Sequence, residues 1–307
     1  MKIAVMGAGA VGCYFGARLH QAGHEVVLIG RPALVEAVRT RGLRLQAADF
    51  DGALPLQADS DPSAVAGAGL VLVCVKSGDS EAAAAAIAPH LAAGAVVLSL
   101  QNGVDNAARL SRVLGREAIP AAVYVAAGME GAGHVVHHGR GELVIGPSPA
   151  SAAIAAQLSA SNIPTQVSDR VAEALWTKLV INCAYNALSA LTRQPYGELV
   201  RTPGMVAAIG DVVDECRAVA AALDVRLPDT LWDDVLAISR SMAGQRSSTA
   251  QDVARGKPSE IDYINGHVVR EGERLGIAVP ANRLLHALVK AHDLAAAGRL
   301  AGAHAAG

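Results

Sequence analysis

Aromatic residues and cysteines are scarce in this sequence. Phe, Trp and Tyr make up only 3% of the 307 residues, so a core has to be built mainly from Ala, Val, Leu and Ile. The four cysteines lie far apart and include no C-x-x-C pair, which argues against a zinc framework and against a disulfide-rich secreted domain. We therefore expect reduced thiols, no metal site and a cytoplasmic protein. The cysteines are Cys13, Cys74, Cys183 and Cys216.

An excess of basic residues and a long apolar run are also missing. Lys and Arg number 26 against 28 Asp and Glu, a net charge of -2, so the chain lacks the positive charge that binds a nucleic-acid backbone. No apolar run reaches the roughly 18 residues that span a bilayer. The apolar run after Lys2 ends in glycines beyond Met6, with no cleavage-like segment after it. We expect neither nucleic acid nor a membrane as a partner.

The chain does have room for two domains and a substantial core. Its length of 307 residues allows about two domains of roughly 150 residues each, and a hydrophobic share of 52% excludes a disordered chain. In the first half, short apolar runs alternate with segments of helical composition, which predicts a parallel sheet with helical crossovers. The predicted strands are 2–6, 24–29, 70–75, 95–100, 119–125 and 164–167, and the predicted helices are 11–22, 79–91, 104–114 and 151–160.

Two further features complete the predicted organisation. Segments 134–138 and 142–145 alternate apolar and polar residues, so we expect an antiparallel hairpin that closes the sheet. From about residue 169 the pattern becomes helical, which predicts an α/β domain over 1–168 and an all-α domain over 169–307. The expected helices of the second domain are 171–191, 202–223, 231–242, 259–275 and 282–297.

The residues between the first predicted strand and helix match G-x-G-x-x-G. In this context the pattern is typical of a Rossmann-type dinucleotide-binding domain, in which Gly7 permits a tight turn, Gly9 lets a pyrophosphate approach and Gly12 lets helix and strand pack closely. The N-terminus of the helix would offer unpaired N–H groups to the phosphates. The alternative is an ordinary strand–turn–helix without a ligand. The candidate cofactor-binding residues of the loop are Gly7, Ala8, Gly9, Ala10, Val11 and Gly12.

The end of the second predicted strand distinguishes between two dinucleotides. An NAD-type site usually carries Asp or Glu about 20 residues after the loop, where the acid binds the ribose diol. This chain has Arg31, whose guanidinium attracts a 2′-phosphate and can bind it with two parallel hydrogen bonds. We therefore expect NADP(H). The alternative is that Arg31 is a solvated loop residue and that a distant acid binds the ribose.

Lys76 and Asn102 follow the third and fourth predicted strands. Ligands of open α/β sheets bind beyond the carboxyl ends of the strands, so topology places both residues on the functional edge. Lys76 is a candidate partner of a cofactor phosphate, and Asn102 offers a donor and an acceptor near the nicotinamide. The alternatives are simple surface exposure for Lys76 and a turn role before Gly103 for Asn102.

Three polar residues share one face of the first predicted helix of the second half. Lys178, Asn182 and Asn186 are spaced by four residues, and the helix is otherwise apolar nearly all round, so we expect it to be buried. A buried lysine and two buried amides need partners. We interpret them as a wall that hydrogen-bonds a polar substrate, with Lys178 supplying a proton. The alternative is an exposed polar face, or amides bonded to neighbouring backbone.

A polar segment after residue 246 supplies the last candidates. Ser259 is a plausible N-cap of the predicted helix 259–275, which puts Glu260 in the first turn, where the helix dipole favours a carboxylate. Asp262 is a candidate capping-box partner. These structural roles compete with a functional role for Glu260.

Together these motifs resemble the ketopantoate reductases (2-dehydropantoate 2-reductases) over nearly the whole chain. The matching stretches are KIAVMGAGAVG, Arg31, Lys76, QNG at 101–103, WTKLVINCAYN at 176–186 and SSTAQDVARGKPSEIDYINGHVV at 247–269. The last two are specific to that family. The resemblance implies a Rossmann-type N-terminal domain, an all-α C-terminal domain and an active-site cleft between them. It also implies NADPH-dependent reduction of 2-dehydropantoate to pantoate in pantothenate and coenzyme A biosynthesis.

The resemblance also implies roles for individual residues. Lys178 is the general acid that protonates the developing alkoxide while hydride reaches the C2 ketone. Tyr196 stands where the best-known members carry an Asn that contacts the substrate, so the identity of the 2-oxo acid stays open. The implied substrate contacts are Asn102, Asn182, Asn186 and Ser248, and the implied cofactor contacts outside the glycine loop are Arg31, Lys76, Asn102, Ala126 and Glu260, with Glu260 also implied in catalysis.

Other functions remain open at this stage. The alternatives are an NADP-dependent reductase of another small 2-oxo acid, a β-hydroxyacid dehydrogenase-like enzyme and a redox-sensing NADP-binding regulator without catalysis. The segment 247–269 argues against a β-hydroxyacid dehydrogenase. A regulator is disfavoured because a sensor needs no proton donor, and the polar candidates are all present: Lys178, Asn182, Asn186, Ser248 and Glu260. A homodimer is compatible with the sequence, although no heptad repeat indicates one.

Overall fold

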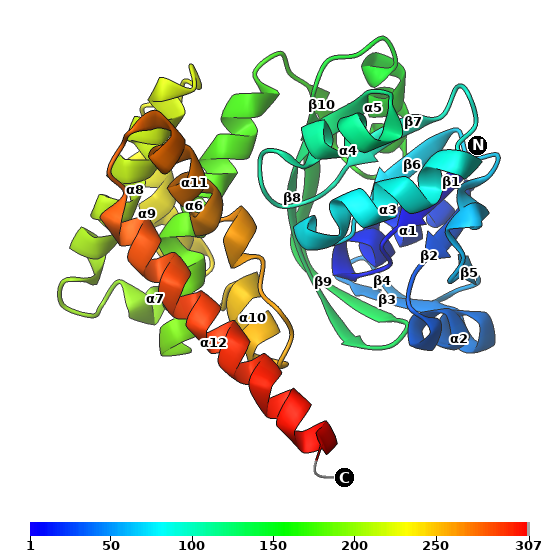
Figure 1. Ribbon diagram of the computed structural model, residues 1–307. Helices are drawn as coiled ribbons and strands as arrows, with labels where there is room; N and C mark the ends of the chain where they lie inside the picture. Colours follow the sequence, from blue (N-terminus) through cyan, green and yellow to red (C-terminus); the bar gives the residue numbers. More distant parts are fainter. Residues whose placement is uncertain (306–307) are drawn as a thin grey trace. The chain divides into compact units, whose positions relative to one another are not determined.

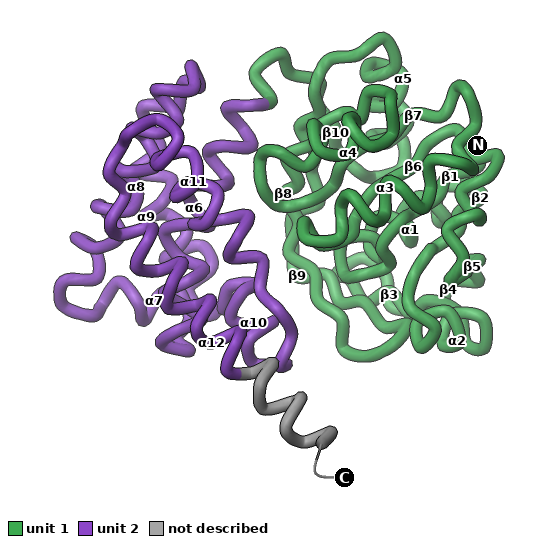
Figure 2. The backbone as a smooth tube through the Cα atoms, in the orientation of Figure 1, with its two compact units in different colours: residues 1–171 green, residues 172–307 purple. Residues whose placement is uncertain are grey.

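The chain divides into two compact units, Met1–Val171 and Ala172–Gly307 (Figure 2). The computed structural model describes the backbone of residues 1–305 and the side chains of residues 1–295. All strands of the described chain belong to the first unit. The division lies within a few residues of the domain boundary expected at 168/169.

Six parallel strands at the centre of the first unit run in the order β5-β2-β1-β6-β7-β8. The chain moves outward from β1 through β2 to β5 and then crosses back to β6, so the strand order reverses between β1 and β6. Rossmann-type domains bind dinucleotides at the carboxyl ends of the strands beside such a reversal. The bounds are β1 (Lys2–Met6), β2 (Glu25–Ile29), β5 (Gln57–Asp59), β6 (Leu70–Val73), β7 (Val96–Ser99) and β8 (Ala118–Gly131). The expected Rossmann-type α/β domain is confirmed.

Helices cover both faces of this sheet (Figure 1). Apolar residues of α1 and α5 join one core with residues such as Ile3 and Leu28, while α3 and α4 contribute to a second core with Ala4 and Val71. Neighbouring strand residues thus face opposite cores, and β6 is buried along its whole length. The bounds are α1 (Ala10–Gln21), α2 (Pro32–Arg41), α3 (Ser80–Ile87), α4 (Asn106–Leu114) and α5 (Ser151–Ala160), with short 3-10 helices η1 (Pro62–Val65), η2 (Ser77–Asp79) and η3 (Ala88–His90).

The predicted hairpin within 134–145 is wrong. These residues form one strand, β9 (His134–Ile145), which pairs antiparallel with the long strand β8. Gly139, Arg140 and Gly141 have φ of 141°, 61° and 151°, but they shift the register against β8 instead of reversing the chain. Such bulges bend a strand without ending it. The hairpin of this region is therefore the β8–β9 pair.

Residues 32–59 contain four elements that the sequence analysis did not identify. Besides α2 and β5, they form β3 (Leu43–Ala47) and β4 (Phe50–Leu54), an antiparallel pair that extends the sheet beyond β9. Exposed residues alternate with more buried ones along both strands, so they lack the continuous apolar run by which the central strands were found. The short strand β10 (Thr165–Val167) pairs with β9.

The second unit is helical, as expected. Its elements are α6 (Val171–Thr192), α7 (Tyr196–Leu199), α8 (Met205–Ala222), α9 (Leu231–Ser241), α10 (Ser248–Ala254), η4 (Ile261–Tyr263), α11 (Asn265–Leu275) and α12 (Pro280–Ala305). The first turn of α6 follows Ser168, whose Oγ accepts a hydrogen bond from Arg170 N (3.1 Å) and whose carbonyl accepts one from Val171 N (3.2 Å). A single helix thus begins in the first unit and continues into the second.

The predicted helix 259–275 begins in the wrong place. Residues 261–263 form a separate 3-10 turn, and the α-helix starts only at Asn265. Ser259 is not an N-cap: its Oγ donates to Asp293 Oδ2 at 2.6 Å. A contact distant in sequence therefore decides the conformation here. The short helix α10, which the sequence analysis missed, precedes this segment.

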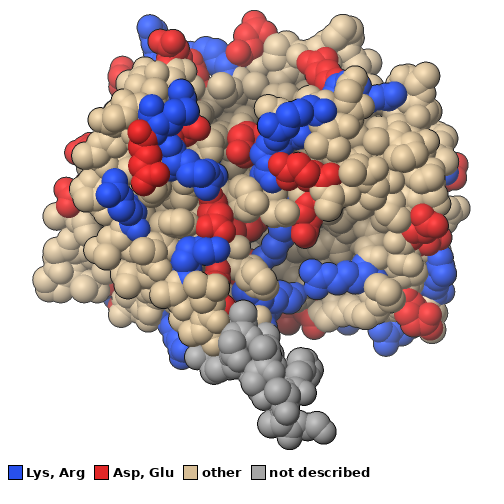
Figure 3. All heavy atoms as spheres, in the orientation of Figure 1, with Lys and Arg blue, Asp and Glu red and all other residues tan. Residues whose placement is uncertain are grey.

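Charge is mixed over the surface. On the face shown in Figure 3, Lys and Arg (blue) and Asp and Glu (red) are interspersed, and neither sign forms a continuous field. In the described part of the chain, every helix is too short or too polar to cross a membrane.

Candidate functional site

The glycine loop connects β1 to α1 and is tied to the end of β2. The N–H groups of Gly7 and Ala8 both donate to Ile29 O, each at 3.0 Å. Gly7 has a φ of +106°, and a Cβ there would overlap the backbone of Val75. A Cβ on Gly12 would overlap the carbonyl oxygen of Gly7. Packing within the protein therefore requires both glycines.

Gly9 is different because, beyond its two chain neighbours, no heavy atom of the described chain lies within 4 Å of the position that its Cβ would occupy. It is the N-cap residue of α1, where no side chain caps the helix and the first turn carries no acidic residue. The first turn of α1 therefore carries no carboxylate that would compete with an anion, and the space at the Gly9 Cβ position is open. This arrangement fits the pyrophosphate of a dinucleotide, since a helix N-terminus attracts anions and Gly9 leaves room for their approach.

Arg31 follows the end of β2. It is exposed and precedes Pro32 at the start of α2, and its carbonyl accepts the N–H groups of Leu34 (3.0 Å) and Val35 (3.1 Å). Its side chain forms no hydrogen bond or ion pair with the described residues. The neighbouring strand end is Asp59 of β5, whose carbonyl accepts a hydrogen bond from Gly30 N at 2.9 Å. The Arg31 guanidinium thus has no partner among the described residues, at the edge where a 2′-phosphate is expected.

Asn102 lies in the loop after β7 and is half-buried. Its backbone carbonyl accepts hydrogen bonds from Ser77 Oγ (2.8 Å) and from Asn106 Nδ2 (2.6 Å). Ser77 belongs to the loop after β6 that also carries Lys76. The two loops at the carboxyl ends of β6 and β7 are therefore joined at the Asn102 carbonyl, which fixes the backbone beside both candidate side chains.

A buried polar network continues beneath these loops. Asn106, only 2% exposed, accepts hydrogen bonds from Ser80 Oγ (3.0 Å) and from Arg109 (3.1 Å) through its Oδ1. Gln101 in turn donates to Ser80 Oγ at 2.7 Å. Sequence reasoning missed Asn106, and the only signal was a second asparagine four residues after Asn102. Ala126, another candidate cofactor contact, is half-buried in β8 opposite Gly139 of β9.

The helix α6 carries the three polar residues expected on one face. Lys178 and Asn182 are half-buried, and Asn186 is 2% exposed. Asn186 Nδ2 is buried and has no hydrogen-bond partner in the described structure. Around the stripe, Leu175, Leu179 and other apolar side chains are buried. The helix is thus apolar on most sides, and the polar face formed by Lys178, Asn182 and Asn186 includes one buried amide donor that has no partner among the described residues.

Ser247 joins the start of α10 to α6. Its Oγ donates to Asn186 O (3.1 Å) and accepts from Ala250 N (3.0 Å), and it is 0% exposed. Ser248, the expected substrate contact, is the exposed first residue of α10. Sequence reasoning overlooked Ser247, although a serine directly before a short helix is a usual N-cap signal.

Glu260 is half-buried and directly precedes η4, so it does not stand in the first turn of an α-helix as expected. Asp262 is not a capping-box residue. Its carboxylate contacts His286 Nε2 and Lys290 Nζ of α12, both at 2.7 Å. Burial raises the pKa of Asp262, but the hydrogen bonds from Lys290 and His286 outweigh it and hold the pKa below its usual value. With the bond from Ser259 to Asp293, the segment around Glu260 is attached to α12 on both sides.

Tyr196 begins α7 and is 8% exposed. Its ring meets that of Tyr185 edge to face at a centroid distance of 5.2 Å. Burial raises the pKa of the Tyr196 hydroxyl far above its usual value. The side chain that departs from the family pattern therefore belongs to a buried aromatic pair of the second unit.

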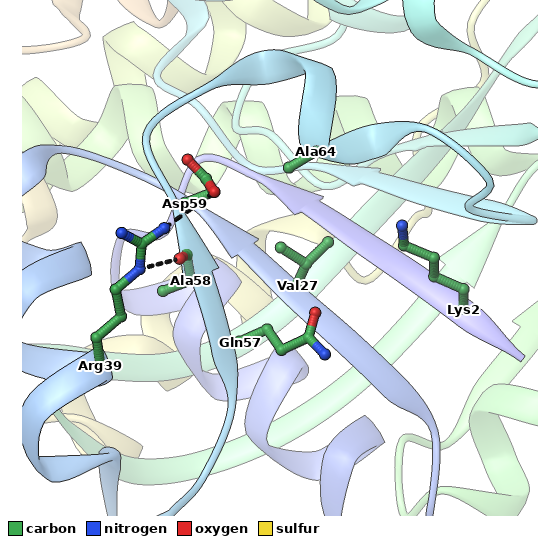
Figure 4. A pocket seen from close by; sticks show the side chains of 7 residues that line it. All are labelled: Lys2, Val27, Arg39, Gln57, Ala58, Asp59 and Ala64. Carbon is green, nitrogen blue, oxygen red and sulfur yellow. Dashed lines mark hydrogen bonds and ion pairs between the residues drawn. The ribbon is translucent and has the colours of Figure 1, made fainter.

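A pocket of about 360 Å³ lies elsewhere in the first unit (Figure 4). It opens beside β5 and η1, and Lys2 at the amino end of β1 borders it. Neither the glycine loop nor Arg31 lines this pocket, so it is not the expected pyrophosphate site, although Asp59, at the strand end beside Gly30, belongs to its lining. Its lining residues are Lys2, Val27, Arg39, Gln57, Ala58, Asp59 and Ala64.

Comparison with known proteins covers both units. Residues 3–150 match the family described as ketopantoate reductase PanE/ApbA, and residues 170–293 match its C-terminal counterpart. The 2-dehydropantoate 2-reductase of Archaeoglobus fulgidus is 32% identical over 294 residues, which cover 94% of this chain and 97% of the relative.

Solved structures show the same likeness. A PanE/ApbA family ketopantoate reductase from Ralstonia eutropha JMP134 has a TM-score of 0.94 and 56% identity, covering 96% of this chain and 99% of that one. A D-mandelate dehydrogenase in a ternary structure with NADH and anilino(oxo)acetate has a TM-score of 0.91 and 27% identity at the same coverage. The chain therefore belongs to the ketopantoate reductase family and is an oxidoreductase that acts on a small molecule.

Proposed function

We propose that this protein reduces 2-dehydropantoate (ketopantoate) to pantoate with NADPH. The observation that carries the proposal is the buried Nδ2 of Asn186, which lacks a partner in the described structure and belongs to the same helix face as Lys178 and Asn182. A buried donor without a partner costs about 1–3 kcal/mol, so a ligand that accepts this hydrogen bond explains why the helix keeps it. The oxygen atoms of a 2-oxo acid are suitable acceptors.

The residues of the first unit fit the cofactor. The glycine loop and the N-terminus of α1 would hold the pyrophosphate, Arg31 the 2′-phosphate and Lys76 a further phosphate oxygen. Asn102, Ala126 and Glu260 would contact the remainder of the cofactor. When bound, NADPH supplies the hydride that reduces the C2 ketone.

The residues of the second unit would bind the acid and supply the proton. Ser248 and the amides of Asn182 and Asn186 would hold the substrate carboxylate and hydroxyl. Lys178 would donate a proton to the oxygen on C2 as negative charge develops there. Glu260, whose segment is attached to α12, would orient the substrate or the lysine. This mechanism requires Lys178 and the glycine loop to meet at one cleft.

Steady-state kinetics test the proposal. We expect loss of reduced-nicotinamide absorbance with ketopantoate, and a higher kcat/KM with NADPH than with NADH. Lys178→Ala should lower kcat at least about 100-fold while the protein stays folded. Lys178→Arg is the matched control, because it keeps the charge without an easily released proton. Near-normal turnover by either variant would exclude Lys178 as the proton donor.

A bulkier 2-oxo acid is the second candidate substrate. Tyr196 replaces an expected amide with a buried aromatic ring, and the D-mandelate dehydrogenase is among the similar structures. A panel should compare ketopantoate with phenylglyoxylate and branched 2-oxo acids, in the wild type and in Tyr196→Asn. If Tyr196 favours an apolar substituent, the variant should shift preference toward ketopantoate. Turnover of 3-hydroxy acids, or cofactor binding without any turnover, would instead indicate a β-hydroxyacid dehydrogenase or a regulator.

We also propose a cytoplasmic homodimer with a substrate domain over 169–307. All four cysteines are free thiols, as a reducing compartment favours.

The dimer would be formed through α12. Leu284 and Leu288, one turn apart on this helix, are 60% and 45% exposed and would pack against a second copy. Analytical ultracentrifugation tests the dimer, and Leu284→Glu should shift it to monomer.

A further inference from the structure

Asp59 is the carboxylate beside the expected 2′-phosphate site. Strands β2 and β5 run parallel, with Ile29 paired to Asp59, and the next residue, Gly30, donates its N–H to Asp59 O at 2.9 Å. Arg31 comes directly afterwards. The last residue of β5 thus lies at the strand edge where Rossmann-type domains bind the adenosine ribose.

An acid at this edge would normally select against a 2′-phosphate. Free carboxylate oxygens accept hydrogen bonds from a ribose diol, and their negative charge repels a phosphate in its place. Asp59 is therefore a candidate for the distant acid that would bind the ribose if Arg31 were only a solvated loop residue. Whether it does so depends on what occupies its two oxygens.

Both oxygens of Asp59 already have partners within the chain. Arg39 NH2 donates to Asp59 Oδ2 at 2.9 Å, and Asp61 N donates to Oδ1 at 3.0 Å. Arg39 is fixed further by a bond from its Nε to Ala58 O at 2.9 Å, as the dashed lines in Figure 4 show. Arg39 belongs to α2, the helix that begins directly after Arg31. One short helix therefore follows the phosphate-binding candidate and carries the cation that neutralises the nearby acid.

We propose that Arg39 is a determinant of cofactor specificity: by pairing with Asp59, it occupies the acid that would bind an unphosphorylated ribose and cancels the charge that would repel a 2′-phosphate. This inference rests on the proposed use of NADPH. It makes Arg39 a positioning residue that acts through Asp59, whereas Arg31 would bind the phosphate itself.

If the Arg39–Asp59 pair only stabilised the fold, removing Arg39 would lower the melting temperature and leave the nucleotide preference unchanged. The side chains of Arg39 and Asp59 are 55% and 40% exposed, and exposed ion pairs contribute little to stability. Removing Arg39 should therefore leave the protein folded and its melting temperature nearly unchanged. Any selective change in nucleotide binding then reports on the charge of Asp59.

The test measures binding of two probes that differ only in the 2′-phosphate, adenosine 2′,5′-bisphosphate and adenosine 5′-monophosphate, to the full-length protein by calorimetry. In Arg39→Gln, we expect the ratio of their affinities to fall by about three- to tenfold, and the loss to shrink at high salt because the charges are screened. The double variant Arg39→Gln/Asp59→Asn should restore the wild-type ratio. An unchanged ratio in the single variant, or no restoration in the double variant, would refute the proposal.

A matched control exists in the same unit. Arg44 and Asp51 form a similar pair, with side chains 52% and 51% exposed, on β3 and β4 at the other end of the strand order. Arg44→Gln should leave the affinity ratio unchanged. The wild-type ratio tests the proposed function separately: if the wild type prefers the monophosphate, the proposed use of NADPH is wrong. The role of Arg39 is tested by the change in the affinity ratio between the wild type and Arg39→Gln.

Discussion

Replacing Gly9 by alanine should weaken dinucleotide binding without unfolding the protein. Apart from the residue itself and its two chain neighbours, no heavy atom of the described chain lies within 4 Å of the new methyl group. Gly9 has a φ of −85°, which alanine adopts without strain. Packing within the described chain therefore does not require glycine at this position, whereas a bound ligand would need the space. Gly12→Ala is the contrasting change, because its methyl would overlap the carbonyl oxygen of Gly7.

The expected energies separate the two variants. In Gly9→Ala, the reduced freedom of the unfolded chain stabilises by about 0.4–1 kcal/mol, while the loss of a favourable N-cap residue costs a comparable amount, about 0.5–1 kcal/mol. The net change in unfolding free energy should stay within about 1 kcal/mol of zero. A methyl forced against a bound pyrophosphate should cost about 1–3 kcal/mol, by analogy with overpacking, which corresponds to roughly a 5- to 150-fold higher Kd.

Thermal unfolding without cofactor and calorimetric titration with NADPH measure both quantities. Gly9→Ala should melt within a few degrees of the wild type yet bind NADPH weakly, whereas Gly12→Ala should lose stability by about 1–3 kcal/mol. If Gly9→Ala bound NADPH as tightly as the wild type, the glycine loop would not hold the pyrophosphate. A large loss of stability in this variant would show that protein packing, and not the ligand, requires the glycine.

Four further substitutions test other parts of the structure. Asn106→Ala removes a buried amide with partners on both sides and should lower the unfolding free energy by about 2–4 kcal/mol, measured by urea denaturation; a loss below about 1 kcal/mol would contradict the network. Ser247→Ala should lower stability, whereas Ser248→Ala should raise KM for the 2-oxo acid with little change in melting temperature. The pKa of Asp262 is lowered in the folded protein. Its ionised carboxylate therefore adds to the free energy of unfolding above its unfolded pKa of about 3.9, and this stabilisation disappears as pH falls through the folded pKa. Melting curves from pH 7 to pH 3 should show wild type and Asp262→Asn converging in acid, and a constant difference would exclude this linkage.

The central strands and the glycine loop could be predicted because their signals are local. Residues of β1 and β6 are apolar on both faces, since helices cover both sides of the sheet, and a continuous apolar run makes such a strand visible in sequence. The stripe of Lys178, Asn182 and Asn186 was visible for a similar reason, because polar residues are conspicuous on an apolar helix.

The features that were missed depend on partners far away in sequence. Serine is a common N-cap residue, but the Ser259 hydroxyl donates a hydrogen bond to Asp293 and the helix starts only at Asn265. Asp262 likewise pairs with Lys290 instead of capping a helix. In β9, the glycines around residue 140 look like a turn, yet pairing with β8 carries the strand through them. In each case a tertiary contact overrides a valid local signal.

The start of α6 has a practical consequence for dissecting the protein. Ser168 accepts hydrogen bonds from the N–H groups of Arg170 and Val171. It therefore stabilises the first turn of α6, the helix that carries Lys178, Asn182 and Asn186. A gene fragment that begins at residue 169 would separate this helix from its cap, and its leading turn should fray. Expression of the C-terminal half alone should therefore start at or before Ser168.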